Sequence, residues 1–332
     1  MNVYKLLKSN RLIRSSRLKL AGILALHQLR RRYFGLFLDP VLGCNMRCQM
    51  CYFSDDDYRR QARGRFSPEQ IRLVADKFFP YALKLQVGCG AEPTLYGDLS
   101  DIFALAKQRG VPYISMTTNA NLLQKDDLRR YILAGLDELT LSLHGVRQAT
   151  YETLMEGGSY DKLLSAMAAA TELKKEFKSF KLRVNYTINE DNCLELADFF
   201  DVFGHYGIDI LQMRPIQKLG NSKYANFSHK SLNANYDATI GKVKAECRRR
   251  GITVVCPDKA DLTKQRNDES IVFDYTYIYM SPREFFDAGF SLESDTYHAY
   301  RKRQGFPRQL LKRIFSRSLS SDNRTKLNYG IN

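Results

Sequence analysis

The chain has 332 residues, of which 44% are hydrophobic and 26% are charged, and its formal net charge is +15. This composition supports a substantial hydrophobic core in one large domain or two ordinary ones, and it excludes disordered, collagen-like and coiled-coil proteins. The apolar run over residues 20–26 is much shorter than the ~20 residues that a membrane-spanning helix needs. The N-terminus also lacks the arrangement of an export signal, so we expect a cytoplasmic protein.

The positive charge is concentrated at the two ends of the chain. Residues 1–34 contain nine Lys or Arg and no acidic residue, and residues 299–332 contain nine against the single Asp322, which leaves the middle nearly neutral. Solvated termini explain this distribution, and so does peripheral contact with an anionic membrane or a phosphorylated substrate. Nucleic acid offers the same negative field but is not required. Between residues 5 and 17 the basic side chains recur at every third position, which does not favour a single membrane-surface helix.

Strand and helix patterns alternate through the first two thirds of the chain. Such alternation predicts a parallel sheet with right-handed crossovers, either open or closed into a barrel. In both arrangements the catalytic loops follow the carboxyl ends of the strands. The six predicted strands span residues 34–42, 83–88, 113–118, 138–143, 181–188 and 208–214.

The helices between these strands have recognisable ends. Ser67 and Pro68 predict the start of a helix, and Gly110 and Gly135 predict the ends of the next two. Beyond residue 215 we expect a helix over 235–250, a short strand over 252–256 and an aromatic-rich appendage or barrel cover over 273–300. The helices predicted before that point span residues 68–78, 98–109, 125–134, 159–177 and 191–206.

Three of the seven cysteines, Cys44, Cys48 and Cys51, form a C-x3-C-x2-C pattern directly after the first strand. Three thiolates from one short loop can hold three corners of an iron-sulfur cluster and leave one iron open. Structural zinc is the weaker interpretation, because it normally takes four ligands and the nearest histidines are His27 and His144.

This cysteine loop resembles the defining loop of the radical S-adenosylmethionine (SAM) enzymes, and further similar motifs follow in order over residues 34–216. In that family the open iron chelates the amino and carboxylate groups of SAM. The segment Gly88-Cys89-Gly90-Ala91-Glu92-Pro93 is similar to the family's Gly-Gly-Glu-Pro, with Ala91 in place of the second glycine. The resemblance implies that Glu92 binds the ammonium group of the methionine moiety and that Gly88 and Gly90 allow close approach of the backbone.

Three more polar residues match positions that contact SAM in the family. Asn119, in a segment similar to Thr-Asn-Gly, is expected at the ribose, and Ser142 at the ribose or the carboxylate. Asn185 on the fifth strand is a further expected contact. The residue before the third cysteine is usually aromatic but here is Met50, so we expect the adenine to pack on Met50 and Tyr52 unless both residues fill the core.

Two other polar residues, His144 and Arg214, have two interpretations each. His144 is either a proton donor or substrate contact, or a hydrogen-bonded structural imidazole. Arg214 either binds a carboxylate or closes the barrel through a salt bridge, and Arg183 shares one side of its strand with Asn185.

The resemblance implies an α/β fold, namely a partial (β/α)6 TIM-like barrel with a C-terminal α+β extension. It also implies one 4Fe-4S cluster, which an external donor such as flavodoxin or ferredoxin reduces. The reduced cluster cleaves SAM to a 5′-deoxyadenosyl radical, which abstracts hydrogen from a substrate that the sequence does not identify. We expect a basic, helical N-terminal segment (1–33), the core barrel (34–216), an extension covering it (217–300) and a basic tail (301–332).

The remaining cysteines, Cys89, Cys193, Cys247 and Cys256, lack cluster spacing, so we expect no auxiliary cluster and favour a small-molecule, lipid or sugar-linked substrate over a peptide. The aromatic residues of 273–300 are candidates for a cavity wall or for core. The alternative hypothesis is a basic protein that binds nucleic acid or anionic membrane and holds a structural metal in the cysteine loop.

Overall fold

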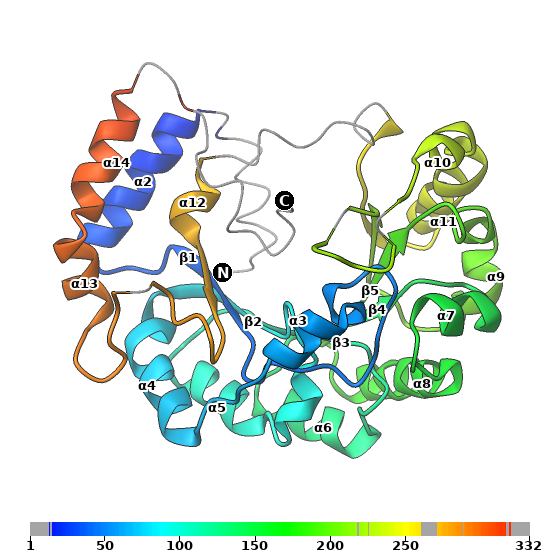
Figure 1. Cartoon of the computed structure of the whole chain (residues 1–332), viewed down its shortest axis with the longest axis horizontal. Coiled ribbons are helices and arrows are strands. Elements are labelled where there is room, and N and C mark those ends of the chain that lie inside the picture. The colour runs from blue at the N-terminus through cyan, green and yellow to red at the C-terminus, as the bar shows by residue number, and fades with distance from the viewer. Residues whose placement is uncertain are drawn as a thin grey trace.

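The computed structural model describes residues 13, 15–217, 219–224, 226–259, 271–287, 289–316 and 319. Within these residues, eight parallel strands form one curved sheet in the order β7-β6-β5-β4-β3-β2-β1-β8 (Figure 1). The partial barrel expected from the sequence is confirmed. Its strands are β1 (Phe34–Leu38), β2 (Ala82–Val87), β3 (Ile114–Thr118), β4 (Glu138–Leu143), β5 (Lys181–Ile188), β6 (Ile210–Pro215), β7 (Thr253–Val255) and β8 (Tyr277–Met280).

Helices cover the outer, convex face of the sheet (Figure 1). None of the described helices has both the length and the apolar composition needed to cross a bilayer. The α-helices are α2 (Ser16–Gln28), α3 (Asp56–Gln61), α4 (Pro68–Phe78), α5 (Ser100–Gln108), α6 (Lys125–Ala134), α7 (Gln148–Leu154), α8 (Tyr160–Glu176), α9 (Phe199–Phe203), α10 (Lys230–Ala234), α11 (Lys242–Arg249), α12 (Phe273–Thr276), α13 (Tyr297–Arg303) and α14 (Phe306–Ile314).

The C-terminal extension adds a strand to each edge of the sheet. β7 pairs with β6, as a short strand was expected there, and β8 pairs with β1. The prediction of an appendage or cover over 273–300 is therefore wrong for the four residues of β8. Ile278 is buried against the core, and Tyr277 stacks on Phe37 of β1 with ring centroids 4.3 Å apart. Four residues are too few for their hydrophobic period to reveal a strand.

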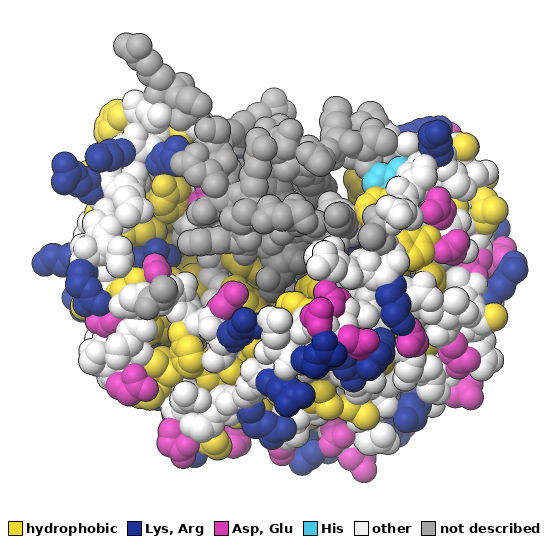
Figure 2. Space-filling model, viewed as in Figure 1, with side chains coloured by type: hydrophobic (Ala, Val, Ile, Leu, Met, Phe, Trp, Pro, Cys, Tyr) yellow, Lys and Arg dark blue, Asp and Glu magenta, His cyan; other side chains and the backbone are white. Residues whose placement is uncertain are grey.

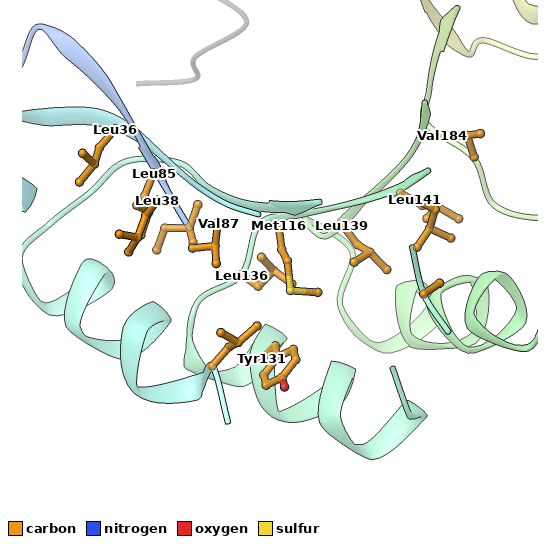
Figure 3. Packing of buried hydrophobic residues seen from close by; sticks show 14 of the residues in the cluster. Leu36, Leu38, Leu85, Val87, Met116, Tyr131, Leu136, Leu139, Leu141 and Val184 are labelled. Carbon is orange, nitrogen blue, oxygen red and sulfur yellow. The ribbon is translucent and has the colours of Figure 1, made fainter. Parts of the chain in front are cut away.

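The apolar core lies between the sheet and the outer helices (Figure 3). Leu85 and Val87 of β2, and Leu139 and Leu141 of β4, point toward the helices and are fully buried. Because successive side chains of a strand point to opposite faces, the residues between them face the barrel interior. That inner set is largely polar: Lys84, Gln86, Ser115, Thr117, Thr140, Ser142, Arg183, Asn185, Gln212 and Arg214.

The helix ends show which of the predicted start and stop residues the structure uses. The Ser67 hydroxyl accepts from the Gln70 amide and the Gln70 side chain accepts from the Ser67 amide, which forms a capping box at the start of α4. Gly135 ends α6 in the left-handed conformation. The long helix predicted over 191–206 is wrong: it is reduced to a 3-10 turn (Glu195–Asp198) and α9. Asn192 explains its late start, because its amide group donates to two carbonyl oxygens outside the segment.

Candidate active site

The three motif cysteines lie on the loop that follows β1 and connects to the 3-10 turn Tyr52–Ser54. The Cys51 amide donates to the Cys48 carbonyl at 2.9 Å, which folds the loop back on itself. Two amides also face sulfur: Met46 N lies 3.5 Å from Cys44 Sγ, and Phe53 N lies 3.5 Å from Cys51 Sγ. Amide donors directed at sulfur stabilise thiolates and iron-sulfur clusters.

The three thiols are close enough to affect one another electrostatically. Burial raises the pKa of Cys44 to about 12 and that of Cys51 to about 11. Burial, and then the negative charges of the other two thiolates, raise the pKa of Cys48 well above its usual value. Three thiolates are therefore unfavourable together unless a bound cation compensates them, as metal ligation does. All three residues keep part of their surface accessible.

Within the described residues, no three Cys, His, Asp or Glu side chains converge on a point suited to one metal ion. In a cubane cluster each thiolate binds a different iron, so its ligands do not have to converge in this way. Cys89 and Cys193 contact neighbouring carbonyl oxygens, at 3.7 Å from Gln86 O and 3.6 Å from Glu190 O respectively.

The loop carrying Glu92 is hydrogen-bonded to the cysteine loop, since the Glu92 amide donates to the Gly43 carbonyl at 2.9 Å. The buried carboxylate accepts at Oε1 from the Thr94 amide and from the hydroxyls of Thr94 and Thr118, and at Oε2 from the Asn119 amide at 2.8 Å. Burial raises the pKa of Glu92, although these donors oppose the shift. Oε2, with one donor, retains acceptor capacity for a ligand.

Asp39 holds the other side of this loop and was missed in the sequence. It is fully buried, and its carboxylate accepts from the Cys89 amide at 2.7 Å, the Gly90 amide at 2.9 Å and the Tyr279 hydroxyl at 2.7 Å. Burial raises the pKa of Asp39 to about 6. Its partners come from the loop after β2 and from β8, which are remote in sequence, so no local pattern could have identified it.

The two glycines of the motif have contacts within the chain itself. Gly88 has φ +79°, and a Cβ there would lie 2.3 Å from the Thr117 carbonyl and 2.7 Å from the Pro93 ring. Gly90 accepts a hydrogen bond at its carbonyl from the Tyr52 hydroxyl. Close approach of the backbone to a cofactor stays a prediction, because packing inside the loop already requires glycine at position 88.

Asn119 links the end of β3 to the cysteine loop. Its Nδ2 donates to Asn45 Oδ1 at 2.8 Å and lies 3.8 Å from Cys44 Sγ. One glycine missed in the sequence, Gly158, leaves room for the Met46 side chain of the same loop. A Cβ on Gly158 would lie 2.5 Å from Met46 Cε. The structure thus brings the cysteine loop, Glu92 and Asn119 together, while the ribose contact stays a prediction.

Ser142 and Asn185 lie opposite each other in the register of β4 and β5. Among the described residues, the Oδ1 atom of Asn185 and the Nδ1 atom of His144 are buried without a hydrogen-bond partner. Such groups cost about 1–3 kcal/mol unless a ligand or water satisfies them. Burial, and then Arg214, lower the pKa of His144 to about 4, so its ring is neutral near pH 7. The orphaned atoms fit a polar ligand in the barrel.

Tyr52 and Met50 both have partners in the protein. The Tyr52 ring contacts Phe53 and Tyr58, and Met50 Sδ lies 3.1 Å from Asn189 Nδ2. Adenine packing on Tyr52 and Met50 stays a prediction.

The barrel interior also carries charges that the sequence analysis did not bring together. Glu138 is buried and pairs with Arg183, with Nε 3.0 Å from Oε1. Burial lowers the pKa of Lys84, and nearby Glu138 opposes the shift while Arg183 adds to it. The alternation of polar and apolar residues along β2, β4 and β5 is the sequence signal that could have identified these inward-facing charges.

Comparison with known proteins agrees with this geometry. A family model described as the radical SAM superfamily matches residues 39–200. A probable GTP 3′,8-cyclase of Saccharolobus solfataricus is 28% identical over 190 residues, which is 57% of this chain and 59% of that protein. The corresponding protein of Sulfolobus acidocaldarius is 26% identical over 212 residues, covering 62% and 65%. The chain thus spans about three fifths of the length of these relatives.

Solved structures share the fold. Streptococcus suis SuiB bound to S-adenosylmethionine aligns with a TM-score of 0.61 at 15% identity, over 89% of this chain and 69% of SuiB. The enzyme anSMEcpe with bound AdoMet aligns with a TM-score of 0.52 at 18% identity, over 67% and 63%. Family model, curated relatives and fold agree, and they agree with a cysteine loop held beside Glu92: the chain belongs to the radical SAM superfamily.

Proposed function

We propose that this chain is a radical SAM enzyme that binds one 4Fe-4S cluster through Cys44, Cys48 and Cys51. The observation that carries the proposal is that hydrogen bonds join the cysteine loop, Glu92 and Asn119 to one another. These three motifs follow the ends of three different strands. When bound, the cluster and SAM supply a 5′-deoxyadenosyl radical that abstracts hydrogen from a substrate.

The residues around the cysteine loop would bind and orient SAM. Oε2 of Glu92 has room for an ammonium donor beside the Asn119 amide. Oδ1 of Asn185 would accept from a hydroxyl or amine of the ligand, and Ser142 lies opposite it. Gly88 keeps the Glu92 loop closed against the Thr117 carbonyl. Tyr52 would pack beside the adenine.

The barrel interior suits a polar, anionic substrate. Lys84, Arg183 and Arg214 face it on β2, β5 and β6, where Glu138 pairs with Arg183. Basic side chains in an enclosure of low dielectric attract carboxylate or phosphate groups. The name of the curated relatives makes GTP the first candidate to test. We further propose an external one-electron donor such as flavodoxin or ferredoxin, and residues 34–216 as the catalytic barrel.

Metal analysis of protein purified without oxygen separates this proposal from a structural metal in the loop. We expect a brown protein with about four irons and about four sulfides per chain. Cys48→Ala should lose most of the iron, whereas the matched control Cys256→Ala, at a partly exposed cysteine far along the chain, should retain it. Stoichiometric zinc in place of iron, or iron retention in Cys48→Ala, would contradict the proposal.

A further inference from the structure

The helix pair α2 and α14, at one end of the molecule in Figure 1, carries several exposed hydrophobic side chains. Eleven large hydrophobic side chains are exposed among the described residues, and more than half of them lie in this pair or directly beside it. We call this set the terminal apolar surface: Ile13, Leu18, Leu26, Leu29, Leu311 and Phe315.

The two helices run side by side, and a hydrogen bond joins the start of α2 to the end of α14. The Arg17 guanidinium donates to the Ser316 carbonyl at 3.0 Å. This contact brings together the ends that carry Leu18, which is 66% exposed, and Phe315, which is 81% exposed. The inner sides of the two helices pack against the core, where Leu20 of α2 and Leu310 of α14 are both fully buried.

The outer side of α2 is apolar over its whole length. Residues 18, 22, 25 and 29 share one helical face, and they are Leu, Gly, Ala and Leu, all exposed. The buried residues Leu20, Ile23 and His27 occupy the opposite face. On α14, Leu311 and Phe315 are four residues apart and also face outward. An ordinary solvated helix presents polar residues there.

The two helices and the residues next to them in sequence carry only positive charge. Residues 13–33 and 299–316 contain no Asp or Glu. Exposed basic side chains flank it on both helices, at Arg17, Arg30 and Arg31 on the side of α2 and at Arg308 and Lys312 on α14. Figure 2 shows Lys and Arg side chains gathered over this edge of the molecule.

We propose that the terminal apolar surface docks the protein peripherally on an anionic lipid bilayer. A basic rim around exposed Leu and Phe side chains matches the headgroup and acyl boundary of such a bilayer. Nucleic acid would use the charges but would leave the apolar side chains in water. A second copy of the chain would bring two positive surfaces together, which is repulsive. The sequence did not favour a single basic helix at the membrane surface. The proposed surface is built instead from two helices, α2 and α14.

Flotation of the full-length protein with vesicles tests this proposal without reference to the cluster or to catalysis. We expect the protein to float with vesicles of phosphatidylcholine and phosphatidylglycerol at 7:3, and to remain in the dense fraction with phosphatidylcholine alone. Since the attraction is partly electrostatic, raising the salt concentration should weaken binding.

Matched variants separate the two components of binding. Each basic residue near an anionic surface contributes about fivefold to partitioning, so Arg308→Gln with Lys312→Gln should reduce it about 25-fold. Leu18→Gln with Phe315→Gln should reduce it at least about tenfold, because two apolar side chains leave the bilayer. The controls are Leu133→Gln with Leu194→Gln, at leucines that are 60% and 59% exposed elsewhere, and Lys175→Gln with Lys178→Gln. Both controls should bind like the wild type.

Four outcomes would overturn the proposal. The first is absence of flotation with the anionic vesicles. The second is a loss of binding in the control variants as large as the loss in the variants of the terminal apolar surface. The third is full binding by the Leu18 and Phe315 variant, which would indicate a purely electrostatic contact. The fourth is concentration-dependent dimerisation of the wild type that the same variant abolishes, which would assign the surface to a second copy.

Discussion

Two buried carboxylates, Asp39 and Glu92, organise the site, and they differ in what remains available to a ligand. Both oxygens of Asp39 are occupied by donors of this chain, from the Cys89 and Gly90 amides and the Tyr279 hydroxyl. Glu92 receives three donors at Oε1 and only one at Oε2. Asp39 is therefore a positioning residue, and Glu92 is the candidate ligand-binding residue.

The first prediction concerns the pH dependence of stability at Asp39. Its pKa of about 6 in the folded chain exceeds its usual value, so the folded state binds the proton more tightly than the unfolded state. This contribution is complete below about pH 4 and is lost as the pH rises through 6, with a total of about 3 kcal/mol. The free energy of unfolding of the wild type minus that of Asp39→Asn, from urea titrations, should fall over this range.

The exposed Asp126→Asn is the control, and its difference from the wild type should stay within about 0.5 kcal/mol at every pH. A constant difference between the wild type and Asp39→Asn from pH 4 to 7 would show that the folded state does not hold this proton.

The second prediction concerns Glu92→Gln. The amide places an NH2 group among donors and removes the negative charge that would face an ammonium group, so SAM affinity should fall about 10- to 100-fold. Equilibrium dialysis with the reconstituted, iron-loaded protein measures the change. Glu172→Gln, at an exposed residue of α8, should bind SAM like the wild type. Equal affinity of Glu92→Gln at equal iron content would remove Glu92 from the binding site.

The turn after β2 requires a glycine at position 88 because a side chain there would collide with the neighbouring strand. Comparing alanine substitutions at Gly88 and Gly97 separates this collision from backbone strain. Gly88 and Gly97 both have positive φ, at +79° and +94°, but a Cβ on Gly97 meets nothing within 4 Å. Gly97→Ala should therefore show only backbone strain of about 1–3 kcal/mol. Gly88→Ala should lose a further 1–3 kcal/mol, roughly, because its Cβ collides with the Thr117 carbonyl. Equal losses in urea unfolding would contradict the close packing.

Elements with strong local signals could be predicted from the sequence. β4 and β5 have the predicted bounds, and so does α6, because hydrophobic runs and a glycine stop marked them. β8 could not be predicted, since its four residues become a strand only by pairing with β1. The helix expected over 191–206 failed for a related reason: Asn192 bonds across to the His144 carbonyl, a contact that no local pattern reveals.

The residues of the candidate site also divide into those that the sequence identified and those that it did not. Cys44 and Glu92 were identified because each sits in a motif of fixed spacing. Asp39, Gly158 and Lys84 were missed because their importance comes from residues remote in sequence: a β8 tyrosine, the Met46 side chain and the charge of Glu138. Sequence spacing identifies groups that bind external atoms, whereas tertiary packing determines which groups position them.

The whole molecule combines a polar barrel interior, a cysteine loop at the carboxyl-terminal edge of the sheet and a helix pair at one end with exposed basic and apolar side chains. The first two features belong to one proposed chemistry. The third is independent of it, since its residues lie on α2 and α14 and not on the strands that carry the site.

Radical chemistry at the cysteine loop is tested most directly by the formation of 5′-deoxyadenosine by the reconstituted protein under anaerobic conditions, with SAM and a strong one-electron reductant. We expect reductant-dependent product in the wild type and in Cys256→Ala, and its loss in Cys48→Ala. Protein that carries about four irons per chain but releases no 5′-deoxyadenosine, with or without GTP and other anionic candidates, would contradict this expectation.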